Sequence, residues 1–164
     1  MLGVDPGTTA TGYGVVERPE AGTSRLIECG VIRAPARAPL EQRLAAIFEA
    51  LTGLIHRHRP DAMAIEDVFV AKNARSALVL GHARGVILLA AAREGVSVAQ
   101  YPPAVIKKAV VGAGAATKEQ VQRMIATLLR LKAPPAPADA ADGVAVALTH
   151  CLGAGRRFRR AVVG

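Results

Sequence analysis

The first sixteen residues, MLGVDPGTTATGYGVV, constrain the fold of this 164-residue chain more than any other stretch. Apolar or small residues run directly into Asp5, the sequence Pro6-Gly7-Thr8-Thr9 interrupts them, and a second such run resumes at Gly12. This pattern predicts a buried strand, a tight turn and a second strand, with one carboxylate at the end of the first strand. Asp5 is then either a residue that initiates the turn or part of a metal or phosphate site. Acids elsewhere in the chain must decide between the two.

Beyond this hairpin the chain alternates between predicted strands and predicted helices, which is typical of an α/β protein. The apolar spacing predicts strands over residues 24–33, 61–68 and 96–101, and helices over residues 40–59, 73–94, 105–111, 118–132 and 139–152. No internal repeat or second domain is visible. We therefore expect one domain over residues 1–164, with a short basic tail over about 155–164.

Glu66 ends the predicted strand 61–68, which the chain reaches through a helix. A strand reached in this way should lie parallel to its neighbour, so Asp5 and Glu66 should meet at the same edge of the sheet. Asp67 should face the opposite side, because side chains alternate along a strand.

Two further acids, Asp139 and Asp142, are three residues apart at the start of the last predicted helix and therefore share one face. Acids at this position also complement the helix dipole, which is the stronger interpretation when the pair is taken alone. With Asp5 and Glu66, however, four acids come from two strand ends and one helix start, and clustered carboxylates repel unless a cation neutralises them. Oxygen ligands select Mg²⁺ or Mn²⁺ over zinc, so the pattern predicts a hard-metal site.

The charge balance indicates a polyanionic partner. The chain has 21 Lys and Arg residues against 13 Asp and Glu residues, a net charge of +8, which favours nucleic acid over a membrane; the alternative is that the protein is simply basic. Two metal ions about 4 Å apart can activate a water molecule and stabilise the leaving oxygen in phosphodiester hydrolysis. Together, the acidic cluster and the basic surface predict a metal-dependent nuclease.

The cysteine and histidine residues suggest neither a disulfide framework nor a zinc site. Cys29 and Cys151 are far apart and have no partner pattern. His56 and His58, two apart near a helix end, should point away from each other, so a structural role is favoured. The N-terminus has no charged and then apolar leader, so we expect a cytoplasmic protein.

In the predicted helix 73–94, His82 and Arg84 interrupt the apolar run, which we expect to be too short to span a bilayer. Gly81 and Gly85 are four residues apart and would let another helix approach closely. The sequence leaves open whether that helix belongs to the same chain or to a second copy.

Four segments taken in order resemble the RuvC family of bacterial Holliday-junction resolvases. They are GVDPG with TGYG at residues 3–14, AIEDVFVAKNARSALVLGHARG at 64–85, KKAVVGAGAATKEQVQRM at 107–124 and PADAADGVAVALTHC at 137–151. The resemblance implies an RNase H-like mixed five-stranded sheet flanked by helices. It also implies a homodimer that makes paired, symmetric nicks in strands of like polarity at four-way DNA junctions, in recombination and repair.

The same resemblance assigns roles to individual residues. It implies that Asp5, Glu66, Asp139 and Asp142 hold two Mg²⁺ ions, with Mn²⁺ able to replace them. It places Lys107 and Lys118 near the scissile phosphate, where fixed cations stabilise developing charge. It implies base stacking by Phe69 and DNA contacts by Lys72, Asn73, Arg75 and Lys108. It identifies the helix over Asn73–Glu94 with the dimer interface and the RuvA–RuvB branch-migration complex as a partner.

Two positions depart from the family pattern. The chain begins two residues short of the usual family start, so we expect a first strand weakened at its outer end. Gly143 stands where the family commonly has Ala, which lowers helix propensity beside Asp142.

Three alternative functions remain to be weighed against a resolvase. The Asp5-Pro6-Gly7-Thr8-Thr9 turn resembles the first phosphate loop of actin-like ATPases and sugar kinases, but those enzymes need two such domains. A junction-binding protein without catalysis would lack at least one of the four acids. An RNase H-like nuclease of the YqgF type, acting on RNA, fits the VAVALTHC segment after Asp142 less well.

Overall fold

The computed structural model describes residues 1–20, 23–67 and 74–153, which form five strands and five helices. In chain order these are β1 (Leu2–Asp5), β2 (Ala10–Glu17), β3 (Arg25–Arg33), α1 (Leu40–His58), β4 (Ala62–Glu66), α2 (Ala74–Arg93), β5 (Ser97–Tyr101), α3 (Pro103–Val111), α4 (Lys118–Leu128) and α5 (Ala138–Cys151).

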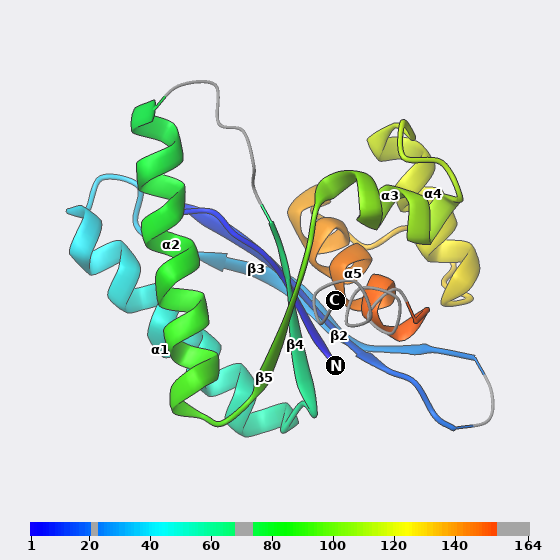
Figure 1. The fold of residues 1–164 in the computed structure, drawn as a ribbon, viewed down its shortest axis with the longest axis horizontal. Helices are drawn as coiled ribbons and strands as arrows, with labels where there is room; N and C mark the ends of the chain where they lie inside the picture. Colours follow the sequence, from blue (N-terminus) through cyan, green and yellow to red (C-terminus); the bar gives the residue numbers. More distant parts are fainter. Residues whose placement is uncertain (21–22, 68–73, 154–164) are drawn as a thin grey trace, which may run out of the picture.

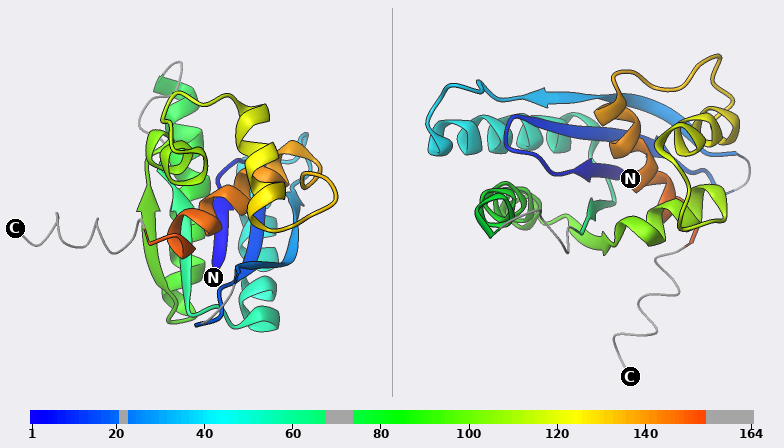
Figure 2. Two further views of the ribbon diagram at one scale, coloured as in Figure 1. Left: turned by 90° about the vertical axis from the view of Figure 1, so that its right-hand side faces the viewer. Right: turned by 90° about the horizontal axis from the view of Figure 1, so that it is seen from above.

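The five strands form one mixed sheet in the order β3-β2-β1-β4-β5. Strands β1, β2 and β3 pair antiparallel, whereas β4 is parallel to both β1 and β5. Helices α1 and α2 cover one face of the sheet, and α3, α4 and α5 cover the other (Figures 1 and 2). The predicted mixed five-stranded sheet with flanking helices is confirmed.

Each face of the sheet has its own hydrophobic core. One core joins α1 and α2 to β1 and β4 through fully buried residues such as Ile47, Leu51 and Ile87. The other surrounds α5, which is buried over almost its whole length. Because α5 consists largely of Ala, Val and Gly, its backbone can approach the sheet closely. This is the element that carries Asp139 and Asp142.

Helix boundaries differ from the prediction by more than one residue at two places. Helix α3 begins at Pro103, before the predicted start at residue 105, because proline lacks only an N–H that the first turn does not use. Helix α4 ends at Leu128, before the predicted end at residue 132, and Arg130 adopts a positive φ of 52°. The predicted cap at Thr117 is confirmed, and it is reciprocal: its hydroxyl accepts from the Gln120 N–H while the Gln120 side chain accepts from the Thr117 N–H.

Helix α2 corrects one expectation. By length and composition the helix is apolar enough to cross a membrane, so its apolar run is not too short. It nevertheless packs into the sheet core, where Ala83, Ile87, Ala90 and Ala91 are buried. A Cβ placed on Gly81 or Gly85 would meet nothing within 4 Å, so packing within the described chain does not explain these two glycines.

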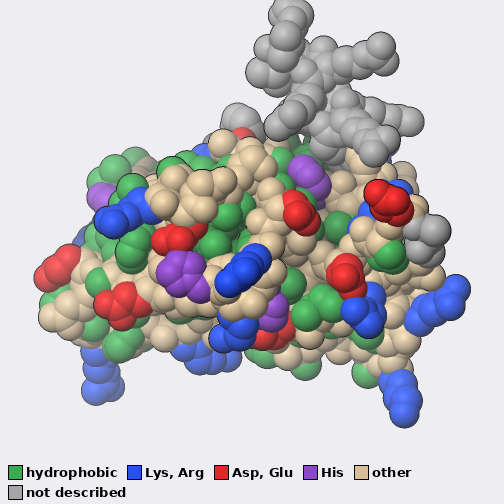
Figure 3. Space-filling view, turned by 90° about the horizontal axis from the view of Figure 1, so that it is seen from below, with side chains coloured by type: hydrophobic (Ala, Val, Ile, Leu, Met, Phe, Trp, Pro, Cys, Tyr) green, Lys and Arg blue, Asp and Glu red, His purple; other side chains and the backbone are tan. Residues whose placement is uncertain are grey.

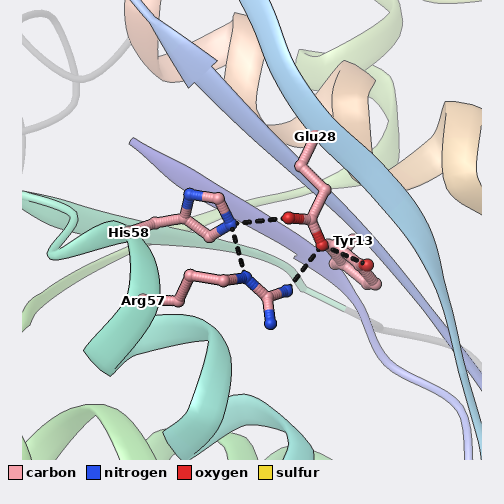
Figure 4. Close-up of polar contacts among 4 residues, drawn as sticks. All are labelled: Tyr13, Glu28, Arg57 and His58. Atoms are coloured by element: carbon pink, nitrogen blue, oxygen red, sulfur yellow. Dashed lines mark hydrogen bonds and ion pairs between the residues drawn. The ribbon is translucent and has the colours of Figure 1, made fainter.

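The basic end of α1 is structural, as predicted. Glu28 of β3 accepts hydrogen bonds from Tyr13 Oη (2.8 Å) and Arg57 Nη2 (2.7 Å), and its other oxygen lies 2.8 Å from His58 Nε2 (Figure 4). Arg57 Nε also donates to His58 Nε2 at 3.2 Å, so Glu28, Arg57 and His58 form one polar cluster. Burial raises the pKa of Glu28, but the three hydrogen bonds outweigh burial and lower it overall. Burial and the bond to Glu28 raise the pKa of Tyr13 to about 12.

We expect Glu28→Gln to destabilise the fold by about 1–3 kcal/mol at pH 7, because charge-assisted hydrogen bonds are lost from a partly buried site. A lowered folded-state pKa stabilises the fold above the unfolded value of 4.5, and this contribution is lost as the pH falls through the folded value. The difference between variant and wild type should therefore shrink toward about pH 3 in urea unfolding. Glu17→Gln is the control, since its ion pair with Arg25 is exposed and should contribute less than about 1 kcal/mol. A pH-independent difference would contradict this account.

Candidate active site

The two strand-end acids lie side by side. Val4 of β1 pairs with Ile65 of β4 in parallel register, so the next residues, Asp5 and Glu66, leave the same edge of the sheet together. Both carboxyl groups are largely buried, and they are hydrogen-bonded to each other. The predicted meeting of Asp5 and Glu66 is thus observed.

Close packing of α5 on β2 brings the other two acids to this edge. Gly12 pairs with Asp5 across the β1–β2 ladder, and a Cβ at Gly12 would overlap the carbonyl oxygen of Asp139. Asp142 lies in the same first turns of α5, and its Oδ2 is 2.9 Å from Lys118 Nζ. Absence of a side chain at Gly12 is therefore what allows the start of α5 to lie over Asp5.

Gly143 takes part in the same close packing. A Cβ at this position would overlap the backbone of Tyr13, with its nearest atoms only 2.5 Å away. The lower helix propensity expected at Gly143 is therefore accompanied by a packing advantage that the sequence does not reveal. The second departure from the family pattern is the shorter start of the chain. There the Met1 carbonyl accepts a hydrogen bond of 3.0 Å from the Val16 N–H, so the outer end of β1 remains paired in the structure.

Burial and mutual repulsion make the acids difficult to ionise together. Burial, followed by the charge and the hydrogen bond of Glu66 and by the charge of Asp142, raises the pKa of Asp5 to about 8, against an opposing effect of Lys118. Burial also raises the pKa of Glu66, while its hydrogen bond with Asp5 lowers it. The hydrogen bond to Asp142 raises the pKa of Lys118. The site therefore favours an added positive charge.

The donor set at this edge suits a hard divalent cation. It consists of carboxylate oxygens from Asp5, Glu66, Asp139 and Asp142, without a thiol or imidazole that would select zinc. Within the described ranges no three Asp, Glu, His or Cys side chains already form a metal-binding group. The ion pair of Asp142 with Lys118, and the raised pKa of Asp5, show that the site needs positive charge or protons to offset its carboxylates. The residues therefore fit the predicted metal.

The other predicted site residues divide into three groups. Lys118 contacts Asp142, and Lys107 on α3 is close enough to lower the pKa of Glu66. Lys108 on α3 and Arg75 in the first turn of α2 are exposed. Phe69, Lys72 and Asn73 lie outside the described residues.

One contact beside Glu66 was missed from the sequence. Asp67 points to the opposite side, as expected, and there its Oδ1 lies 2.9 Å from Arg84 Nη2 of α2. The same Arg84 side chain donates to Gln100 of β5. In the sequence, the only indication of this contact is that Arg84 places a charge within an otherwise apolar helical run. Arg84 thus links the residue after β4 to α2.

A large hollow elsewhere contains none of the four acids. It lies toward the opposite end of the sheet, and its lining includes Met1, Arg18, Pro60, Gln100 and Cys151. Figure 3 shows the face of the molecule that points downward in Figure 1. On this face, Lys and Arg side chains are interspersed with Asp, Glu and His side chains. Cys29 and Cys151 are both free thiols.

Comparisons with known proteins agree with this geometry. The family model described as crossover junction endodeoxyribonuclease RuvC matches residues 1–150. A protein of that name from Pelotomaculum thermopropionicum is 50% identical over 151 residues, covering 92% of this chain and 91% of the relative. The solved structure of Thermus thermophilus RuvC in complex with Holliday junction substrate superposes with a TM-score of 0.88 at 38% identity, covering 93% of each chain.

A more distant structure supports the fold alone. The yeast mitochondrial Holliday junction resolvase superposes with a TM-score of 0.65 at 12% identity, covering 98% of this chain and 85% of that one. Together with the strand order, these structural likenesses confirm the predicted RNase H-like fold.

Proposed function

Because this chain belongs to the RuvC family of crossover junction endodeoxyribonucleases, we propose that it hydrolyses DNA strands at the four-carboxylate edge of its sheet with the help of divalent metal. Family membership makes it a Holliday junction resolvase, acting in recombination and repair. The observation that carries the metal mechanism is the placement of Asp5 and Glu66 side by side with the first turns of α5 packed over them.

The residues of this edge divide into metal-holding and phosphate-stabilising groups. Asp5, Glu66, Asp139 and Asp142 would hold Mg²⁺, or Mn²⁺ in its place. Two such ions supply an activated water molecule and stabilise the leaving oxygen of the broken phosphodiester bond. Lys118 and Lys107 are held near the carboxylates by α4 and α3, where they would stabilise charge on the scissile phosphate. Phe69, Lys72, Asn73, Arg75 and Lys108 are proposed to contact the DNA.

The test of this function is cleavage of a synthetic four-way junction against a linear duplex of the same sequence, with Mg²⁺, with Mn²⁺ and with a chelator. We expect paired nicks at symmetric positions in strands of like polarity, only on the junction and only with metal. Cleavage of an RNA hybrid in preference to the junction would favour the alternative RNA nuclease. Junction binding without cleavage under every metal condition would favour a binding protein.

We further propose that the protein is a homodimer through α2. This helix exposes Leu78 (66%) and Leu89 (53%), and between them lie Gly81 and Gly85, whose α-carbons face open space. Leu78 and Gly85 are seven residues apart, so they share one face of the helix. An exposed apolar face with small residues at its centre suits a second α2 packed closely against it.

We expect Gly85→Leu to convert the dimer to a monomer, because the added side chain meets nothing within its own chain but would obstruct a partner helix. The monomer should nick junctions singly instead of in symmetric pairs. Light scattering and mapping of nicks on a four-way junction measure both effects. Gly53→Leu on α1 is the matched control, since Gly53 is also exposed within a helix and has open space beside it. A dimeric Gly85→Leu variant would rule out this interface.

Three coarser expectations complete the proposal. We propose one nuclease domain over residues 1–164, whose basic tail lies outside the described residues, and a cytoplasmic location. The RuvA–RuvB branch-migration complex is the proposed protein partner, because a resolvase must act where a junction has been positioned.

A further inference from the structure

Arg43 is a partly buried cation that has no acidic partner. It lies in the first turn of α1, and its Nη1 donates a hydrogen bond of 3.3 Å to Thr8 Oγ1 in the turn between β1 and β2. Its Nε is buried and makes no hydrogen bond. The described ranges contain all 13 acidic residues of the chain, and Arg43 forms an ion pair with none of them.

This placement is unfavourable for the isolated protein. A positive charge near a helix N-terminus opposes the helix dipole, and withdrawing an arginine from water without a counter-charge costs free energy. An uncharged side chain at position 43 could pack against the turn without this cost. The position of Arg43 therefore suggests a negatively charged ligand that the folded chain does not itself provide.

The position of the turn indicates what that ligand is. Thr8 is three residues beyond Asp5, in the turn between the end of β1 and the start of β2. The turn is held in place by the Thr11 hydroxyl, which donates to the Gly7 carbonyl at 2.6 Å, and by the Ala34 N–H, which donates to the Thr9 carbonyl at 3.1 Å. Arg43 is thus hydrogen-bonded to an ordered turn that begins directly after Asp5.

We propose that Arg43 and the hydroxyl of Thr8 form a binding site for a backbone phosphate of the DNA strand that passes Asp5. A guanidinium offers paired N–H donors that match phosphate oxygens, and Thr8 orients it before DNA arrives. This inference rests on the proposed function, because it assumes that the DNA strand enters at the carboxylate edge. It assigns a new role to the turn that resembles a phosphate loop.

The test is binding of a synthetic four-way junction by the full chain, with a chelator present, over a series of salt concentrations. Arg43→Gln should lower the slope of log affinity against log salt by about 1 for each site, and weaken binding about tenfold near physiological salt. Arg43→Lys should restore most of the slope. Arg25→Ala, which removes one charge at the far end of the sheet, should leave slope and affinity unchanged.

The outcomes separate this inference from the proposed function. If wild type cleaves junctions with Mg²⁺ but Arg43→Gln keeps the wild-type slope, the phosphate site is wrong and the resolvase proposal stands. If Arg43→Gln and Arg43→Lys both lower the unfolding temperature and activity without changing the slope, the role of Arg43 is structural and the inference is also wrong. If wild type neither binds nor cleaves junctions, the proposed function itself fails.

Discussion

Asp5→Asn is expected to reduce junction cleavage by about 10³-fold or more, which corresponds to about 4 kcal/mol of lost transition-state stabilisation. Asp5 is at the centre of the carboxylate edge, beside Glu66 and under the first turns of α5. Junction affinity should change little, because binding depends mainly on basic residues elsewhere. Single-turnover cleavage and equilibrium binding of the same junction measure the two effects separately.

The same variant should have a distinct pH signature in the absence of metal. The folded-state pKa of Asp5 is raised to about 8 from an ordinary 3.8, so its contribution to stability is full below 3.8 and is lost as the pH rises through about 8. Asn does not titrate. With a chelator present, the variant should therefore unfold about 2–4 °C above wild type at about pH 8.5 and close to wild type at low pH.

Adding Mg²⁺ should stabilise wild type and leave Asp5→Asn almost unchanged, because metal binds the ionised carboxylate. Asp61→Asn, at the other end of β4, is the control and should behave as wild type in every assay. Normal cleavage by Asp5→Asn would show that the metal ligands have been assigned incorrectly.

Gly12→Ala is expected to have the second largest effect, although it removes no charged group. The new methyl group would overlap the carbonyl oxygen of Asp139, so the start of α5 must move away from β2. Displacing Asp139 and Asp142 by about 1 Å should slow cleavage about 10²-fold. Overpacking should also destabilise the fold by about 1–3 kcal/mol.

The matched control is Gly53→Ala, at an exposed position within α1 where a Cβ meets nothing within 4 Å. It should stabilise the protein by up to about 1 kcal/mol through helix propensity and leave cleavage unchanged. Urea unfolding and single-turnover cleavage distinguish the two variants. Wild-type cleavage by Gly12→Ala would mean that close packing at Gly12 does not position the acids.

Much of the architecture could be predicted from local patterns. The change from alternating to helical apolar spacing located the strands and helices, and the helix before β4 implied that β1 and β4 are parallel. From that parallel pair the adjacency of Asp5 and Glu66 followed. The predicted start of α3 was wrong because proline is accepted in a first helical turn, and the predicted end of α4 was wrong because the last turn of a helix depends on tertiary packing as well as on propensity.

By itself the sequence determined which acids end the strands and begin the last helix, since strand alternation and chain connectivity are local properties. Only the tertiary structure decided how closely they approach. The role of Gly12 in positioning the acids follows only from the close packing of α5 on β2. The proposed role of Arg43 follows only from the structure, in which it has no carboxylate partner. Distances between segments far apart in the chain depend on packing, and packing is not a local property.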